Sequence, residues 1–337
     1  MIKLSIVIPL YNNVACVEQC ISSLYSQSLR DDEFEVIIVD DGSTDGSGQL
    51  ADKLASLHSN MQVVHHGSNM STGAARNAGM ALAQGEYVHF VDADDMILKD
   101  SYRYIVDQLM QYQADVIYID FVRDVDYMTP VHSMGVDYCG PIKQFLKDHP
   151  VSVLACRKII KRSFIERNEI RWENINYGDD TAYTWNMLRN EGTLLCSTAK
   201  IYSYRTNENS TVRTRSLDGL KRSVRNMLVT NIKQKEYYKH YADCPRVIKN
   251  FTEKYMILFN RILFTQFSLH ETRELFAQCA GLGIAHINHS RIIHIADFIY
   301  RHPLLFYICR PLIRKIYKTK FHNDNNNPDF LTSPVVK

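Results

Sequence analysis

The chain has 337 residues, which is enough for one large domain or for two. Its apolar and charged fractions, 45% and 23%, are ordinary for a globular protein, and a net charge of +2 gives no electrostatic reason to expect nucleic acid as a partner. Eight cysteines without a C-x-x-C pair favour reduced thiols and a cytoplasmic protein. No apolar stretch approaches the ~20 residues of a membrane-spanning helix, and Pro9 ends the N-terminal apolar run too early for a signal peptide.

Strand and helix patterns alternate as far as Phe121. Apolar runs predict buried strands at Leu4–Ile8, Phe34–Val39, Gln62–His65, Tyr87–Val91 and Asp115–Phe121. Apolar residues at helical spacing predict intervening helices near Val14–Leu24, Leu50–Leu57, Gly73–Ala83 and Ile105–Met110. This order predicts an α/β fold: a mostly parallel, Rossmann-like nucleotide-binding sheet flanked by helices.

Polar clusters follow three of the predicted strands, at Pro9–Asn12, Asp40–Ser43 and Asp92–Asp95. Ligands of such sheets bind at the carboxyl ends of the strands. Asp92 and Asp94 point to the same side of an extended chain, which suits a hard divalent cation that also binds phosphate oxygens. The chain has neither G-x-G-x-x-G nor a P-loop, so a metal and basic side chains would have to meet phosphate charge. We therefore expect a nucleotide-diphosphate ligand.

Four segments together carry a family resemblance: Ser5–Asn12, Val39–Asp45, Gly73–Gly79 and Asp92–Asp95. In order and spacing they resemble the inverting glycosyltransferases of the family-two type, which have the A-type (GT-A) fold. Relatives of this kind build bacterial capsules, exopolysaccharides and lipopolysaccharides. The resemblance implies a GT-A catalytic domain over residues 1–215, with a nucleotide-sugar half at 1–122 and an acceptor half at 123–215.

The resemblance implies that Pro9 and Tyr11 border the nucleobase. Asp41 would accept a hydrogen bond from a uracil-type ring, and Asp40 would lie beside it. The alternative is that these two aspartates belong only to a turn with a helix cap, although that reading suits Ser43 better.

The phosphate and metal side of the site is implied in the same way. Arg76 would approach the nucleotide or its diphosphate, and the alternative is a solvated surface arginine. Asp94 would be the principal ligand of Mn²⁺ or Mg²⁺, with Asp92 near the ribose or the metal. Asp95 is ambiguous, since it could simply cap the following turn.

Tyr177–Tyr183 resembles the acidic motif of the family, with Asp179-Asp180 in place of the usual Glu-Asp. Asp180 matches the general base, which takes the proton of the acceptor hydroxyl opposite the leaving diphosphate. Adjacent Asp179 would raise the proton affinity of Asp180 by like-charge repulsion. The alternative is that both aspartates cap the helix that follows.

Tyr204-Arg205 resembles a later family element in which a basic residue closes over the diphosphate. We expect Arg205 to bind the nucleotide in this way, with Arg213 and Arg215 as weaker candidates and a surface arginine as the alternative. The Q-x-x-R-W motif of processive relatives is absent, since Arg171-Trp172 precede the acidic pair and Asn168 takes the place of the glutamine. A non-processive enzyme is therefore expected.

Residues 216–322 read as a helical C-terminal region, and 323–337 as a flexible tail. Residues 291–321 contain seven lysines and arginines and a single acidic residue, Asp297. An apolar stripe at helical spacing runs from Cys309 to Tyr317, with Arg310 off it. Such a helix suits an anionic membrane surface, here the inner face of the cytoplasmic membrane. The alternatives are a helix docked on its own catalytic domain or a dimer contact.

The sequence thus predicts a metal-dependent inverting glycosyltransferase that moves one sugar from a nucleotide-diphosphate sugar, with uridine as the expected base. The acceptor would be a glycan or a lipid-linked glycan. A sugar nucleotidyltransferase is the first alternative, but Tyr11-Asn12-Asn13 is not its glycine- and arginine-rich loop. A non-catalytic sugar-nucleotide-binding scaffold is the second. The sugar, the linkage, the choice of metal and the oligomeric state stay open.

Overall fold

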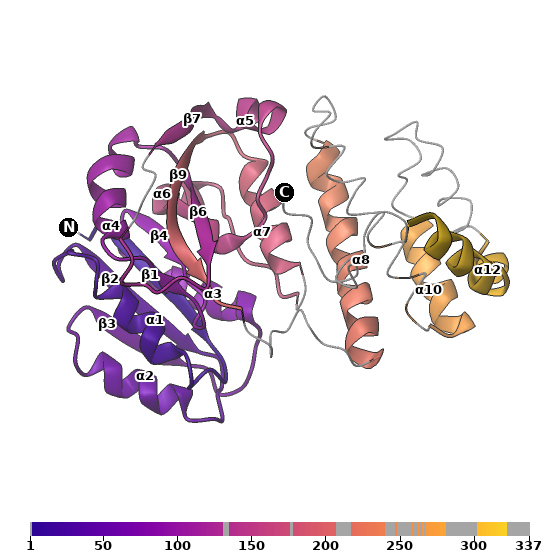
Figure 1. Cartoon of the computed structure of the whole chain (residues 1–337), viewed down its shortest axis with the longest axis horizontal. Helices are drawn as coiled ribbons and strands as arrows, with labels where there is room; N and C mark the ends of the chain where they lie inside the picture. Colours follow the sequence, from indigo (N-terminus) through magenta and orange to yellow (C-terminus); the bar gives the residue numbers. More distant parts are fainter. Residues whose placement is uncertain are drawn as a thin grey trace. The chain divides into compact units, whose positions relative to one another are not determined.

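The computed structural model describes residues 2–130, 135–175, 178–206, 217–239, 267–280 and 302–321, with positions 247, 258, 262 and 265 between them. The chain divides into two compact units, Met1–Asn207 and Glu208–Lys337. Figure 1 shows the sheet and its helices in the first unit and helices in the described part of the second. The weaker candidates Arg213 and Arg215, the domain boundary at 215, residues 291–301 and the tail 323–337 lie outside the described residues.

The first part of the sheet is parallel, as the apolar runs predict. Its strands are β1 (Leu4–Leu10), β2 (Phe34–Asp40), β3 (Met61–His65) and β4 (Tyr87–Phe90), in the order β3-β2-β1-β4. The connecting helices are α1 (Val17–Leu24), α2 (Ser47–Ala55) and α3 (Thr72–Leu82). Every residue of β2 and β4 is buried, because helices cover both faces of the sheet (Figure 1).

The rest of the sheet is mixed. It continues through β8 (Lys158–Lys161), β6 (Val116–Arg123), β9 (Thr193–Tyr204) and β5 (Met96–Ile97), and β7 (Val136–Pro141) pairs with β9. The strand that ends near Phe121, β6, runs in the same direction as β1–β4, as expected, but it is not their direct neighbour in the sheet. Short β8 lies between β4 and β6 and is antiparallel to both, because a strand from the less regular acceptor half fills that position.

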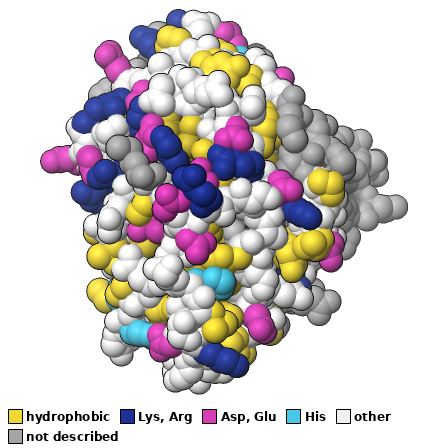
Figure 2. Space-filling view, turned by 90° about the vertical axis from the view of Figure 1, so that its left-hand side faces the viewer, with side chains coloured by type: hydrophobic (Ala, Val, Ile, Leu, Met, Phe, Trp, Pro, Cys, Tyr) yellow, Lys and Arg dark blue, Asp and Glu magenta, His cyan; other side chains and the backbone are white. Residues whose placement is uncertain are grey.

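Short helices complete the first unit: α4 (Ser101–Tyr104), α5 (Ile142–Asp148), α6 (Arg162–Arg167) and α7 (Asp179–Leu188). The predicted helix near 105–110 is a π-helical turn over Ile105–Leu109 followed by a 3₁₀ turn over Met110–Tyr112. Another 3₁₀ turn, Ala155–Arg157, precedes β8. Basic and acidic side chains intermingle on the face that Figure 2 shows, rather than separating into areas of one sign.

A buried carboxylate fixes the start of β4. Glu35 accepts hydrogen bonds from Ser5 Oγ at 2.6 Å and from the backbone N–H groups of Gln84 and Gly85 at 2.6 and 3.2 Å. A Cβ at Gly85 would lie 2.6 Å from the backbone nitrogen of Ser5, so only glycine allows this approach. The strand that leads to Asp92 is therefore held at its beginning as well as along its length.

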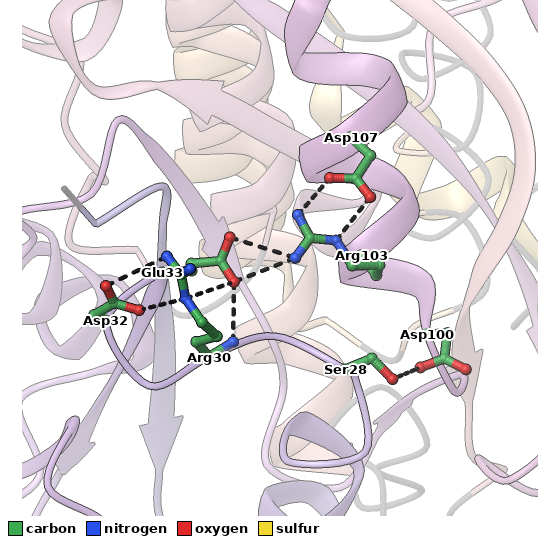
Figure 3. Close-up of polar contacts among 7 residues, drawn as sticks. All are labelled: Ser28, Arg30, Asp32, Glu33, Asp100, Arg103 and Asp107. Carbon is green, nitrogen blue, oxygen red and sulfur yellow. Dashed lines mark hydrogen bonds and ion pairs between the residues drawn. The ribbon is translucent and has the colours of Figure 1, made fainter.

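A surface network ties the loop before β2 to the helical segment after Asp100 (Figure 3). Arg103 pairs with Glu33 at 3.2 Å and also with Asp107, while Ser28 Oγ donates to Asp100 at 2.6 Å. These groups lie at the amino end of β2, away from the strand ends that carry the polar clusters. Exposed pairs of this kind contribute at most about 1 kcal/mol each, so the network orients the loop more than it stabilises the fold.

The described part of the second unit is helical, as expected, with α8 (Leu217–Lys239), α10 (Leu269–Ala280) and α12 (Pro303–Phe321). The side chains after Leu312 lie outside the described ones, so only the positions of Arg310 and Leu312 test the predicted apolar stripe, and both differ from it. Arg310 is buried, and its guanidinium donates to the carbonyls of Phe267 and Ile262 at 3.2 and 3.3 Å. Leu304, Leu305, Ile308 and Leu312 are instead exposed. The two carbonyl acceptors explain why Arg310, which the sequence pattern places on the polar face, is buried.

Candidate functional site

The nucleotide side of the candidate site lies at the carboxyl ends of β1 and β2. The parallel register sets Leu10 beside Asp40, so Pro9 and Tyr11 end one strand next to the aspartate pair that ends the other. Tyr11 is 49% exposed. Asn12 accepts a hydrogen bond from Thr44 N at 2.8 Å and donates its own N–H to Ser43 Oγ at 3.0 Å. These bonds hold the two loops together below the exposed tyrosine ring.

Two consecutive histidines at the end of β3 bond the two consecutive aspartates. His65 Nδ1 lies 2.9 Å from Asp40 Oδ2, and His66 Nδ1 lies 2.7 Å from Asp41 Oδ1. Burial opposes ionisation of Asp40, but hydrogen bonds from Ser43 and His65 outweigh it and lower the pKa of Asp40. The same bond to Asp40 raises the pKa of His65. Sequence reasoning missed both histidines, although their position at the end of a predicted strand was a usable signal.

Asp41 also holds the loop that leads into α3. Besides His66, it accepts the backbone N–H groups of Met70 and Ser71, each at 2.9 Å. Ser71 has a φ of 111° and caps α3 by accepting from Ala74 N at 3.2 Å. Asp41 is only 2% exposed. Its carboxylate therefore positions this loop, and a direct contact with a uracil ring stays a prediction.

Asp95 differs from the other carboxylates of its turn, because it points into the protein and is 1% exposed. It accepts from Tyr202 Oη at 2.7 Å and from the backbone N–H of Arg205 at 2.8 Å, while Asp92 N–H donates to Tyr202 Oη at 3.2 Å. Burial, with Asp92 adding to it, raises the pKa of Asp95 to about 8. Asp95 thus fastens the turn over Asp92–Asp94 to the end of β9.

Arg205, the predicted diphosphate clamp, follows β9 directly. Its backbone is fixed by Asp95, and its Nη1 atom is buried without a hydrogen-bond partner among the described groups. A buried unpartnered guanidinium nitrogen is costly, and an anion would satisfy it. The fit to a diphosphate is therefore chemical, and the contact itself stays a prediction.

The candidate base and the metal turn meet at Arg76. Its Nη2 lies 2.8 Å from Asp92 Oδ1, and its Nη1 lies 3.1 Å both from Asp179 Oδ2 and from Asp180 Oδ1. The side chain of Arg76 is 5% exposed, so the alternative of a solvated surface arginine is wrong. Three carboxylates around one guanidinium leave excess negative charge, which suits a divalent cation.

Asp180 lies in the first turn of α7. Gly178 is the N-cap residue of that helix, with a φ of 79°, so neither Asp179 nor Asp180 occupies the cap position. Asp180 Oδ2 accepts from Ala155 N–H at 3.2 Å, and its side chain keeps 30% exposure. Burial raises the pKa of Asp180 to about 6, Arg76 opposes the shift, and Asp179 adds to it. The carboxylate is held at both oxygens and still reachable.

An aromatic stack supports the guanidinium. The Cζ atom of Arg76 lies 4.3 Å from the ring centroid of Trp172, which stacks on Tyr183 at 4.0 Å and 3°. Asn77 bonds the backbone of Trp172 twice, from Nδ2 to the carbonyl at 2.8 Å and from the Trp172 N–H to Oδ1 at 2.9 Å. Sequence reasoning missed this role of Trp172.

The small residues of α3 allow this contact. A Cβ at Gly73 would lie 2.7 Å from the carbonyl oxygen of Glu173, so α3 approaches the segment after Trp172 as closely as glycine permits. α3 belongs to the nucleotide half and the Trp172 segment to the acceptor half. The run of small residues therefore brings Arg76 to the two aspartates of α7.

Residues 5–166 match the protein-family model "Glycosyl transferase family 2". The chain carries a glycosyl transferase family 2 domain. Similar curated proteins include the uncharacterized glycosyltransferase EpsJ of Bacillus subtilis, 28% identical over 61% of this chain and 62% of EpsJ. Glycosyltransferase GlyG of Streptococcus pneumoniae is 25% identical over 63% of this chain and 73% of GlyG. The expected class of enzyme, a glycosyltransferase, is thereby confirmed at the level of this family 2 domain.

The chain spans less than two thirds of EpsJ. It is also similar to the poly(ribitol-phosphate) beta-N-acetylglucosaminyltransferase TarS of Staphylococcus aureus, with 28% identity over 61% of this chain and only 36% of TarS. The fold is nonetheless shared across the chain. A crystal structure of S. aureus TarS 1–349 in complex with UDP aligns with a TM-score of 0.65, at 18% identity, over 97% of this chain and 93% of that one. The predicted GT-A fold is confirmed.

Two properties of the described residues bear on metal binding and on membrane contact. No three histidine, cysteine or acidic side chains in the described ranges converge closely enough to hold a metal by themselves. A cation at Asp92 and Asp94 would therefore need substrate or water oxygens as further ligands, as Mg²⁺ commonly does. None of the helices in the described parts of the chain is both long and apolar enough to cross a membrane.

Proposed function

We propose that this family 2 glycosyltransferase moves one sugar from a nucleotide-diphosphate sugar to an acceptor hydroxyl, with inversion and without processivity, and that Asp180 is the general base. One observation carries the proposal: Asp92 of the metal turn and Asp180 of α7 bond opposite terminal nitrogens of Arg76. A leaving diphosphate beside one carboxylate and an acceptor hydroxyl beside the other would then flank the same sugar carbon, as in-line displacement requires.

The donor we propose is a uridine diphosphate sugar. The Asp40–His65 pair, in which only the aspartate is buried, and the largely buried Asp41–His66 pair shape the base end of the site, with Pro9 and Tyr11 on the neighbouring strand end. TarS, which shares the fold, has been crystallised with UDP and with UDP-GlcNAc, and this supports the same nucleotide here. Arg205 would bind the diphosphate through the buried nitrogen that has no partner within the described residues.

Asp94 and Asp92 would hold Mn²⁺ or Mg²⁺. Their carboxylate oxygens are the ligands that such hard cations prefer, and the excess negative charge around Arg76 fits a cation. A mannosyltransferase from Pyrobaculum calidifontis, similar in fold with a TM-score of 0.51, was crystallised with GDP-Man and Mn²⁺, which supports a divalent metal. When bound, the cation supplies countercharge to the leaving diphosphate.

The chain's own part in the reaction is to orient the acceptor and take its proton. The acceptor O–H proton passes to Asp180, a bond forms between the acceptor oxygen and the anomeric carbon, and the bond from that carbon to the diphosphate oxygen breaks. The nucleoside diphosphate leaves on the opposite face, which inverts the anomeric centre. Asp180 suits this role because it is ionised above its pKa of about 6 and keeps 30% exposure.

We propose a glycan or lipid-linked glycan as the acceptor. TarS and a similar protein from Bacillus spizizenii, a poly(ribitol-phosphate) beta-glucosyltransferase, are by name transferases of poly(ribitol-phosphate), which supports a polymeric acceptor. Contact of residues 291–321 with an anionic membrane surface on the cytoplasmic side also stays a proposal. It rests on the basic charge of that sequence and on the exposed Leu304, Leu305 and Ile308.

The test is a panel of nucleotide sugars with water as the acceptor, assayed with and without Mn²⁺. We expect release of the nucleoside diphosphate from one uridine-linked donor, dependent on the metal and lost in Asp180→Asn. Production of pyrophosphate from UTP and a sugar phosphate would overturn the proposal in favour of a nucleotidyltransferase. Tight donor binding without turnover on any acceptor would support a binding scaffold instead.

A further inference from the structure

Arg76 makes contacts that an arginine whose role is to bind phosphate would not need. Its Nη1 carries two N–H groups, and carboxylates of Asp179 and Asp180 accept at that atom. Its Nη2 donates to Asp92, and its Nε is buried without a partner among the described groups. The N–H groups left for a diphosphate are the second one of Nη2 and the buried one of Nε, unless the diphosphate displaces a carboxylate.

The guanidinium of Arg76 is also held in place by packing against an aromatic ring. It lies on the ring of Trp172, which is stacked on Tyr183 and held by Asn77 through its backbone. A side chain that is 5% exposed and packed on a stacked ring cannot easily swing toward solvent. Its position is set before any substrate arrives.

Among the described residues, each oxygen of Asp180 has one donor, Arg76 on Oδ1 and the backbone N–H of Ala155 on Oδ2. A carboxylate has about four lone-pair positions, so both oxygens keep one for a hydroxyl. The charged groups that act on Asp180 are Arg76 and Lys158, which favour its ionised form, and Asp179 and Asp92, which oppose it. Arg76 is the cation that bonds it directly.

We infer that Arg76 is a positioning residue for Asp180: it orients the carboxylate and keeps it ionised, and it does not serve mainly as a phosphate ligand. The inference rests on the proposed role of Asp180 as base. It makes one guanidinium the link between the metal turn and the base, so the two ends of the displacement are aligned by one side chain.

The experiment is a double-mutant cycle of Arg76→Gln and Asp180→Asn, with UDP-sugar hydrolysis as the activity and calorimetric binding of UDP with Mn²⁺ as a second readout. We expect Arg76→Gln to cut turnover ~100-fold, as for loss of a group that acts through the base, and to change the UDP dissociation constant less than threefold. Adding Arg76→Gln to Asp180→Asn should then cost little more. Arg30→Gln, at an arginine that is 75% exposed, is the control and should change neither readout.

The pH profile separates positioning from a purely structural role. Loss of the positive charge raises the pKa of Asp180, so the acidic limb of the rate profile should move to higher pH, and Arg76→Lys should restore part of the shift. An equal loss at every pH would overturn the inference, and so would additive effects in the cycle or a tenfold weaker affinity for UDP. Should Arg76→Gln fail to fold, Arg76→Lys carries the same comparisons.

Failure of the proposed function would look different. If Asp180→Asn alone keeps full turnover, Asp180 is not the base, whatever Arg76 does. If Asp180→Asn abolishes turnover and Arg76→Gln acts additively with it or weakens only UDP binding, the base stands and the positioning role falls.

Discussion

His66 Nδ1 lies 2.7 Å from Asp41 Oδ1, and both side chains are largely buried at the strand ends where we expect the nucleobase. An imidazole that donates from Nδ1 to a carboxylate presents Nε2 as an acceptor. The pair can thus offer either a histidine nitrogen or an aspartate oxygen to a ring N–H.

The first prediction is that the site prefers uridine. UDP, whose ring nitrogen N3 carries an N–H donor where that of CDP is an acceptor, should bind more tightly than CDP, and a mismatched hydrogen bond at a buried site costs about 1–3 kcal/mol. Asp41→Asn should weaken this preference and also loosen the loop held through Met70 N and Ser71 N. Calorimetry with both nucleotides measures it. Asp52→Asn, at an exposed partner of His65, is the control, and equal affinities for UDP and CDP in the wild type would remove Asp41 from this role.

The second prediction concerns the metal. Asp94→Ala should lower turnover at least ~100-fold, because the leaving diphosphate loses its countercharge. Since Asp94 lies on a turn after β4 and outside the apolar core, the melting temperature should stay close to that of the wild type. Turnover is measured against added Mn²⁺ after treatment with a chelator. Unchanged activity of the variant under these conditions would contradict the metal role.

The third prediction concerns the base. Asp180→Asn should leave UDP binding nearly intact and lower transfer ~100-fold or more, while Asp179→Asn should be milder because only Asp180 is bonded by Ala155 N–H as well. In the wild type the rate should rise with pH through about 6, because the deprotonated form is the base. A rate that falls with rising pH over this range would point to an acid in place of the base.

The fourth prediction tests the close approach of α3. Gly73→Ala would set a Cβ 2.7 Å from the carbonyl oxygen of Glu173, so the helix or the Trp172 segment must shift. We expect a loss of about 1–3 kcal/mol in the free energy of unfolding, as for other overpacked sites, and a fall in turnover, because Arg76 moves with α3. Urea denaturation measures the first. Gly67→Ala is the control, since a Cβ at Gly67 meets no atom within 4 Å.

The fifth prediction concerns the membrane. Truncation after His289 should reduce co-sedimentation with anionic vesicles, and the binding should weaken with salt, because each basic residue near the surface contributes about 1 kcal/mol. Hydrolysis of the donor should persist, since the candidate catalytic residues precede Ser216. If the full-length protein stays in the supernatant at low salt, residues 291–321 are a packing or dimer element.

The parallel part of the fold was predictable because its strands are buried on both faces. A continuous apolar run such as Leu4–Ile8 is typical of a strand buried in a parallel sheet. The aspartates that follow such strands must then gather at one edge of the sheet. Position along the chain is enough to locate such residues. This explains why Asp40, Asp41 and Asp92 were found at strand ends, as expected.

The partners of these residues were not predictable, because they come from far along the chain. The sequence around Arg76 does not indicate that its guanidinium bonds Asp180. The sequence around Arg310 does not indicate that its guanidinium bonds the carbonyls of Phe267 and Ile262. Short β8 takes its place between β4 and β6 through tertiary packing and not through its own pattern. Hydropathy periodicity shows which side of an element is apolar, and it carries no information about such partners.

The two hydrogen bonds between Asn77 and the backbone of Trp172 have a consequence for how the two halves of the domain can vary. Asn77 recognises only main-chain atoms of Trp172, so these two hydrogen bonds do not depend on which side chain stands at position 172, whereas the contact of the Trp172 ring with Arg76 does. A chimera that keeps Asn77, Gly73 and a tryptophan at position 172 should accept a foreign acceptor half on this nucleotide-sugar half. Recombination at this seam would change what receives the sugar while preserving what supplies it.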